Sequence, residues 1–168
     1  MPCNCIPKVY AYPENSEWGP SFWILLHGLA ERAGKTTDSL FQSDERRAWT
    51  HLLNTTDSVL PCPDCSKHYK EWLNAHPVGS ILTLPYSELR EFVRQWLYAL
   101  HDNVNQRTGK TSIAYEELSA RYLSENIPAS FKILDGVEKR AIQLQGVRIQ
   151  SWNNWVKQYK TLVNTYGL

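Results

Sequence analysis

The chain has 168 residues, 42% of them hydrophobic, and a formal net charge of +1. This length and composition predict one globular domain with a substantial core and exclude a disordered chain. The near-zero charge argues against binding to nucleic acid or to an anionic membrane surface, and no apolar run reaches the roughly 18 residues of a membrane span. The first residues lack the basic and apolar regions of a signal peptide, so we expect the chain to fold in a reducing compartment.

The chain is predicted to be all-α, because no segment shows the alternation of a strand. An irregular arm punctuated by prolines is expected over residues 1–17. Start and stop residues then predict helices over residues 18–33, 43–59, 63–74, 88–108, 114–123 and 137–166, the last of them interrupted by Gly146. Four packed helices are the expected core of the fold.

The most regular predicted helix lies between Ser87 and Gly109. Its apolar residues recur at the 3.6-residue period: Leu89, Phe92, Val93, Trp96, Leu97, Leu100 and Val104. His101 and Asn105 are four residues apart and therefore share one face of this helix. Trp23 and His27 have the same spacing on the first helix. Any one of these residues taken alone would be an ordinary core or hydrogen-bonded group.

Cys62-Pro63-Asp64-Cys65 is the motif with the most chemical content. With Pro63 as the first helical residue, both thiols lie at a helix N-terminus, where the dipole and free amide groups stabilise a thiolate. The thiolate is the nucleophile of thiol–disulfide exchange, although the charge of Asp64 opposes its formation. Cysteines in a reducing compartment more often serve catalysis or metal binding than structure. The motif therefore favours a redox-active dithiol.

Other interpretations of the cysteines remain open. Zinc could be held by Cys62, Cys65 and His68, or by the four cysteines together with Cys3 and Cys5. The chain would then be a zinc-stabilised helical adaptor whose C-terminal amphipathic helix docks a partner, but Cys3-Asn4-Cys5 is tighter than the usual zinc spacing. The cysteines could also be structural or without a role. A flavin-free exchanger of the thioredoxin type lacks the β-α-β pattern that it would need.

Aromatic and imidazole groups on two helices, together with the dithiol and Lys110, suggest a cradle for a flavin. Here the sequence resembles the Erv/ALR family of FAD-dependent sulfhydryl oxidases. The resemblance is carried by residues 19–30 (GPSFWILLHGLA), by the C-x-x-C at 62–65 and by residues 98–110 (YALHDNVNQRTGK). The corresponding family pattern is G-x-x-x-W-x-x-x-H-x-x-A, then C-x-x-C, then H-N-x-V-N with a following G-K. Arg121-Tyr122 matches a later Arg–aromatic pair of the family.

The resemblance implies a four-helix bundle in residues 18–122 that holds FAD at its mouth, with a short fifth helix over the cofactor. The implied FAD contacts are Gly19, Trp23, His27, Tyr98, His101, Val104, Asn105, Lys110, Arg121 and Tyr122. Cys65 would face the isoalloxazine ring, and Cys62 would receive electrons from outside. The family is commonly dimeric through its first two helices, so a homodimer is expected. Residues 123–168 lie outside the resemblance and are predicted to be a helical C-terminal extension of unknown role.

This chain departs from the cellular members of the family at a few positions. Pro20 stands where those members often have Arg, and Asp102 replaces the first Asn of H-N-x-V-N. The long-range structural disulfide of the cellular members has no cysteines left to form it. The chain is therefore most similar to the short enzymes of large DNA viruses, which implies that it acts in the host cytoplasm, or in the virion, on the thiols of virion proteins.

Cys3 and Cys5 are interpreted as a second dithiol that shuttles electrons from the substrate to the core C-x-x-C. A C-x-C disulfide closes a very small ring, so it should be strained and comparatively oxidising. The predicted route runs from protein thiols through Cys3/Cys5 and Cys62/Cys65 to FAD and then to O2, giving H2O2. The alternative is that Cys3 and Cys5 are exposed thiols without a role.

Overall fold

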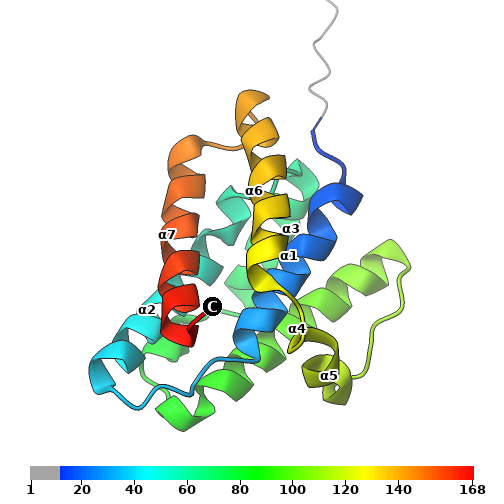
Figure 1. Ribbon diagram of the computed structural model, residues 1–168. Helices are drawn as coiled ribbons and strands as arrows, with labels where there is room; N and C mark the ends of the chain where they lie inside the picture. The colour runs from blue at the N-terminus through cyan, green and yellow to red at the C-terminus, as the bar shows by residue number, and fades with distance from the viewer. Residues whose placement is uncertain (1–11) are drawn as a thin grey trace, which may run out of the picture.

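The computed structural model describes residues 12–168, which are helical with no strand among them (Figure 1). The helices are α1 (Asn15–Ala30), α2 (Ser39–Thr55), α3 (Pro63–Ala75), α4 (Leu89–Thr108), α5 (Leu118–Tyr122), α6 (Ile127–Gln143) and α7 (Ile149–Tyr166). Short 3-10 turns lie between them at Thr56–Ser58, Gly79–Leu82, Tyr86–Glu88 and Tyr115–Glu117. The prediction of an all-α fold, with a short fifth helix and a helical extension, is confirmed. No helix in this part of the chain is long and apolar enough to cross a membrane.

Local capping sets where the first helices begin, and it corrects two predicted boundaries. α1 begins before residue 18, because the backbone N–H of Glu14 donates to the Glu17 carboxylate at 2.9 Å. α2 begins at Ser39 instead of residue 43, because the Asp38 carboxylate accepts from the backbone N–H of Leu40 at 2.8 Å. The start of α3 at Pro63 agrees with the prediction.

The C-terminal extension forms two helices, so the prediction of one interrupted helix over 137–166 is wrong. α6 begins well before residue 137, at Ile127, because the Asn126 side chain accepts from the backbone N–H of Ala129 at 3.0 Å. The chain then reverses direction after α6. Gln145 adopts a left-handed backbone conformation with φ of 60°, which ends the helical path ahead of Gly146.

The extension completes the same hydrophobic core that the first helices begin. α6 lies along α1, and α7 lies along α2 (Figure 1). Fully buried side chains of this core come from the bundle and from the extension alike: Leu25, Leu29, Trp49, Leu52, Leu97, Trp155 and Leu162. The faces of α1 and α2 that point toward α6 and α7 are therefore covered within the chain.

Polar groups fix α7 against α2 at both ends of the contact. The Tyr166 hydroxyl donates to Glu45 Oε1 at 2.6 Å and accepts from Trp49 Nε1 at 2.8 Å. Near the other end, Trp155 Nε1 donates to Thr56 Oγ1 at 3.0 Å, and both side chains are buried. Because a buried N–H or O–H is costly without a partner, these bonds specify one alignment of the two helices.

A second buried network joins α1, α4 and α5. The Glu31 carboxylate accepts from Arg90 and Arg94 at 2.7 Å each and from the Ser119 hydroxyl at 2.6 Å. Burial acts to raise the pKa of Glu31, but the Ser119 hydrogen bond and the Arg94 guanidinium outweigh it and lower that pKa overall. The carboxylate stays ionised, and it holds the short helix α5 beside α1 and α4.

Candidate active site

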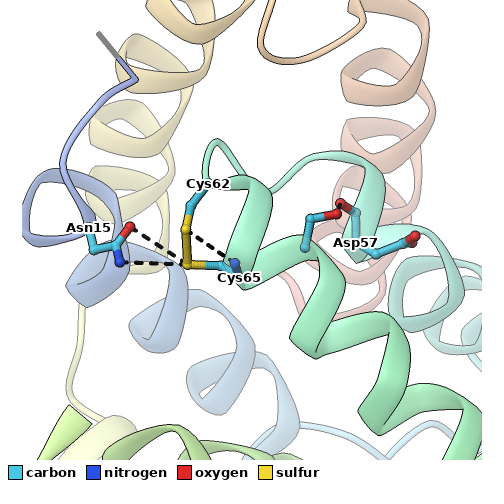
Figure 2. The surroundings of a disulfide bond; sticks show 5 residues. Asn15, Asp57, Cys62 and Cys65 are labelled. Atoms are coloured by element: carbon cyan, nitrogen blue, oxygen red, sulfur yellow. Dashed lines mark hydrogen bonds between the residues drawn. A yellow bond between two sulfur atoms is a disulfide. The ribbon is translucent and has the colours of Figure 1, made fainter. Parts of the chain in front are cut away.

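Cys62 and Cys65 form a disulfide at the N-terminus of α3, as Figure 2 shows. Cys62 is the residue that caps this helix, and its Sγ accepts a hydrogen bond from the backbone N–H of Cys65 at 3.2 Å. Both cysteines are half-buried against the core. On reduction, the helix N-terminus favours the thiolate form of these sulfurs, which is the reactive form in disulfide exchange.

Asn15 lies on one side of this disulfide, at the start of α1 (Figure 2). Its side-chain Nδ2 is 3.6 Å from Cys65 Sγ, and its Oδ1 is 3.8 Å from the same atom. An amide can donate to a disulfide sulfur or a thiolate and can accept from a thiol, so it suits each redox state of Cys65. Asn15 was not predicted as a site residue, because residues 1–17 were expected to be an irregular arm, whereas α1 begins at Asn15.

His27 of α1 and His101 of α4 meet directly. His27 Nε2 and His101 Nδ1 are 3.0 Å apart, so one ring donates and the other accepts. Burial lowers the pKa of His27 to about 3, helped by the charge of His101, and lowers that of His101 to about 4, helped by the charge of Lys110. Both rings are therefore neutral near pH 7.

Aromatic rings stack on both histidines and extend the cluster. The ring of Trp23 lies 3.8 Å from that of His101, with 7° between the planes, and the ring of Tyr122 lies 4.6 Å from that of His27, with 16° between them. The Arg121 guanidinium carbon lies 5.1 Å from the centre of the Tyr122 ring. The structure thus brings these five predicted residues together from α1, α4 and α5. We call them the ring cluster.

The segment after α4 folds back onto that helix through polar bonds. Gly109 ends α4 in a left-handed conformation, with φ of 68°. Ser112 then accepts from Asn105 Nδ2 at 3.1 Å and donates to Asp102 at 2.7 Å. The hydroxyl of Tyr98 donates to the carbonyl of Ile113 at 3.0 Å. Asp102, the position that departs from the family pattern, therefore holds this segment by accepting a hydrogen bond from Ser112. Ser112 was not among the predicted site residues.

The remaining predicted cofactor residues lie around the ring cluster on the same elements. Val104 is half-buried on α4 against the core, and Lys110 is exposed directly after that helix. Gly19 lies one turn before Trp23 on α1, with open space where a side chain would project. Cys3 and Cys5 lie outside the described residues.

A hydrogen bond joins α3, which begins at the disulfide, to α4, which carries His101. His68 Nε2 and Asn103 Oδ1 are 2.8 Å apart. His68 follows Cys65 by one helical turn, and Asn103 follows His101 closely on α4. The helix that begins with the dithiol therefore lies against the helix that carries His101.

The same contacts bear on the zinc interpretation. His68 is bonded to Asn103, and Cys62 and Cys65 are bonded to each other. Within residues 12–168, no group of three or more His, Cys, Asp or Glu side chains is placed to hold a metal ion. The version with four cysteines needs Cys3 and Cys5, which the structure does not describe. The zinc alternative is not supported.

Comparisons with known proteins identify the family of the chain. The model of the Erv1 / Alr family matches residues 20–123. The chain is 35% identical over 105 residues to the FAD-linked sulfhydryl oxidase of an African swine fever virus isolate (Tick/Malawi/Lil 20-1/1983), covering 62% of this chain and 79% of that relative. It is 30% identical over 108 residues to a putative FAD-linked sulfhydryl oxidase of Frog virus 3, covering 64% and 67% respectively.

A rice protein, the FAD-linked sulfhydryl oxidase ERV1, is 28% identical over 120 residues, which are 71% of this chain. The chain spans about half the length of that relative (56%). No solved structure matches the chain. The resemblance inferred from the three sequence segments is confirmed, and the chain belongs to the Erv1/Alr family.

Proposed function

We propose that the protein is an FAD-dependent thiol oxidase that forms disulfide bonds in protein substrates. The observation that carries this proposal is the helix-terminal disulfide of α3, on a helix hydrogen-bonded to α4, where His101 is stacked with Trp23. The printed names of the relatives, among them viral FAD-linked sulfhydryl oxidases, support the same activity. Overall, two thiols and O2 would become one disulfide and H2O2.

The residues present fit an FAD molecule chemically. The half-buried rings of Trp23 and His101 offer planar, uncharged groups for the rings of the cofactor, and the buried rings of His27 and Tyr122 pack behind them. Both histidines stay neutral because burial lowers their pKa. Lys110 and Arg121 supply exposed cations for the pyrophosphate, and Asn105 supplies an amide for polar groups of the cofactor. When bound, FAD would accept two electrons from the dithiol and transfer them to O2.

The chemistry of this chain's own residues is thiol–disulfide exchange. A substrate thiolate would attack Cys62 Sγ, which breaks the Cys62–Cys65 bond and releases Cys65 as a thiolate. The Asn15 amide and the N-terminus of α3 would stabilise that thiolate. A second substrate thiol would then displace Cys62 and close the substrate disulfide. Two electrons would remain on the reduced pair, and the protons of the substrate thiols would pass to Cys62, Cys65 and solvent.

The electron relay, the substrates, the location and the oligomeric state are proposals as well. Cys3 and Cys5 would relay electrons from bulky substrates to Cys62. The relatives from large DNA viruses favour virion proteins as substrates and the host cytoplasm or the virion as the location. A homodimer would have to form through surfaces other than the α1 and α2 faces that α6 and α7 cover.

Replacement of either core cysteine tests the proposed function. Cys62→Ala and Cys65→Ala should each abolish dithiothreitol-driven O2 consumption while the protein stays yellow, because both sulfurs are needed for exchange and neither is needed to hold the rings. Lys70→Ala, on the exposed side of the same helix, is the matched control. An oxygen electrode and the flavin absorbance spectrum are the measurements. Near-normal turnover in either cysteine variant, or colourless parent protein, would refute the proposal.

A further inference from the structure

The first turn of α6 packs on α1 at a glycine, where the chain arrives from α5 (Figure 1). A Cβ on Gly28 of α1 would stand 2.2 Å from Cδ1 of Ile127 and 3.4 Å from its Cγ1. Ile127 is 1% exposed, so its side chain fills the space that a side chain at position 28 would need. Gly28 lies within the α-helix and has no positive φ. The glycine therefore serves the contact with Ile127 and not the backbone of α1.

The same glycine lies against the end of α5. A Cβ on Gly28 would stand 3.6 Å from the backbone oxygen of Tyr122, the last residue of α5. The ring of Tyr122 is stacked on that of His27, which precedes Gly28 in the chain, with 4.6 Å between the ring centres. Ile127 therefore packs at the junction of α1 and α5, beside the pair of residues that close one side of the ring cluster.

The link between α5 and α6 is short, and hydrogen bonds fix it at both ends. It comprises residues 123–126. The Arg32 guanidinium of α1 donates to the carbonyl of Gly28 at 2.7 Å and to the carbonyl of Leu123 at 2.8 Å. At the other end, the Asn126 side chain caps α6. Because a helix as short as α5 is not stable by itself, these neighbouring contacts determine where it lies.

The contacts of α5 differ in which part of the chain supplies them. Ser119, near its start, donates to the Glu31 carboxylate at 2.6 Å, and both residues lie within the region 20–123 that matches the family. Ile127, near its end, lies beyond that region and belongs to the C-terminal extension. The extension therefore supplies a contact beside the candidate cofactor site from outside the matched region.

We infer that Ile127 is a positioning residue of the FAD site: by filling the space at Gly28, it holds the end of α5 so that Tyr122 stays stacked on His27. The inference rests on the proposed function and gives the C-terminal extension a role in it. Ile127 does not meet the cofactor itself in this arrangement and acts only through the residues of α1 and α5.

The ring cluster carries the effect of Ile127 to the rings that the cofactor would meet. His27, under the Tyr122 ring, is bonded to His101 at 3.0 Å, and the ring of His101 is stacked on that of Trp23 at 3.8 Å. A displaced Tyr122 removes the packing that orients His27 and, through it, His101. Because coupling between two binding events is reciprocal, the packing of α6 on α1 should also be tighter when FAD is bound.

The first test measures the dissociation constant for FAD in full-length variants that have been freed of flavin. Ile127→Ala should weaken FAD binding at least about tenfold, and Gly28→Ala should weaken it about fivefold, because residues in contact couple strongly. The double variant Gly28→Ala/Ile127→Val should bind within about twofold of the parent, because valine lacks the Cδ1 atom that the new Cβ would meet. If Ile127→Ala fails to fold, the comparison of Gly28→Ala with the double variant decides the matter.

Leu162→Ala is the matched control. Leu162 is fully buried on α7, which packs on α2 and not on the ring cluster, so its loss should lower the melting temperature and leave the dissociation constant for FAD unchanged. An equal loss of FAD affinity in Leu162→Ala and Ile127→Ala would mean general destabilisation and would overturn the inference.

The second test needs no cofactor. Hydrogen exchange of residues 118–123 in the flavin-free protein reports how often α5 opens, and Ile127→Ala should speed it at least about tenfold while Leu162→Ala leaves it unchanged. Parent-like exchange and full FAD affinity in Ile127→Ala would overturn the inference and leave the proposed function intact. A parent protein that binds no FAD would refute the proposed function and this inference with it.

Discussion

The ring cluster and the interior of the α6–α7 pair are both built from stacked aromatic groups, yet they differ in burial and polarity. In the extension, Phe131 lies 4.2 Å from Tyr159 and Trp152 lies 5.4 Å from Trp155, with planes within 11°. Trp155 is fully buried, and its N–H donates to Thr56. In the ring cluster, by contrast, Trp23 is half-buried, and exposed cations lie nearby.

The difference shows that stacking alone does not identify a cofactor site. The extension's rings have fixed protein partners and contribute to the core. The ring cluster combines the half-buried rings of Trp23 and His101, neutral imidazoles and adjacent cations, which is the chemistry that a flavin nucleotide requires. The two regions should therefore respond differently to substitution, to pH and to the cofactor.

The largest effect is expected where a ring only stabilises the fold. Trp155→Ala should lower the free energy of unfolding by about 3–5 kcal/mol, because it empties a fully buried site. Urea denaturation measures this, with Ile133→Ala as the control, since Ile133 of α6 is 56% exposed. A loss below about 1 kcal/mol would mean that the extension is not part of the core.

The second largest difference is expected in how the stability that each region contributes depends on pH. Burial raises the pKa of Glu138 on α6 to about 8, and nearby Asp135 adds to the shift. The unfolded chain releases this proton near pH 4.5, so this residue's contribution to stability falls as pH rises from 4.5 to 8. His27 and His101, with lowered pKa values, act in the opposite sense: their contribution is present above pH 6.5 and is lost toward pH 4.

Glu138→Gln should accordingly remove the downward slope and raise stability at pH 8, relative to pH 4.5, by roughly 3 kcal/mol. The measurement is the free energy of unfolding at a series of pH values, with Asp135→Asn as the comparison for the smaller charge effect. Parallel pH profiles of parent and Glu138→Gln would contradict the assignment.

A smaller effect should mark the ring cluster as the cofactor site. Bound FAD stabilises the folded state by mass action, and tenfold weaker binding removes about 1.4 kcal/mol of that stabilisation. His101→Ala and Asn105→Ala should reduce the difference in melting temperature between flavin-loaded and flavin-free protein. Phe131→Ala should lower both melting temperatures equally. If His101→Ala and Asn105→Ala keep the full difference and full flavin content, these residues are ordinary core polar groups.

The smallest effect concerns the arm. The double variant Cys3→Ser/Cys5→Ser should lose several-fold more activity toward a folded protein dithiol than toward dithiothreitol, because a bulky substrate depends on the relay and a small thiol can reach Cys62 directly. The ratio of the two rates in variant and parent is the measurement. An equal ratio would leave Cys3 and Cys5 without a shuttle role.

Features that depend on neighbouring residues could be predicted from the sequence. Two examples are Pro63 and Gly109: α3 begins at Pro63, and α4 ends just before Gly109, as predicted. Local signals also misled where two competed: the acidic run after Ser43 suggested a helix start, but Asp38 caps α2 instead. Gly146 indicated an interruption, whereas the left-handed Gln145 beside it makes a full reversal.

Contacts between distant residues could not be predicted in this way. Asn15 and Cys65 are 50 positions apart, and His68 and Asn103 are 35 apart. Each contact depends on how whole helices pack, which no spacing pattern encodes. The ring cluster was an exception, since its helix-spaced pairs occur within recognisable family segments.

The bond between Tyr166 and Glu45 has a consequence for biosynthesis. It joins positions 121 apart, and α2 has no partner for the face that α7 covers until residues 149–166 have been made. Pairing of such distant segments is slow and leaves apolar surface unprotected meanwhile. The nascent chain therefore carries its dithiol on an unfinished scaffold until translation has passed the last helix. The face of α2 that α7 covers therefore cannot be buried within the chain before residues 149–166 have been synthesised.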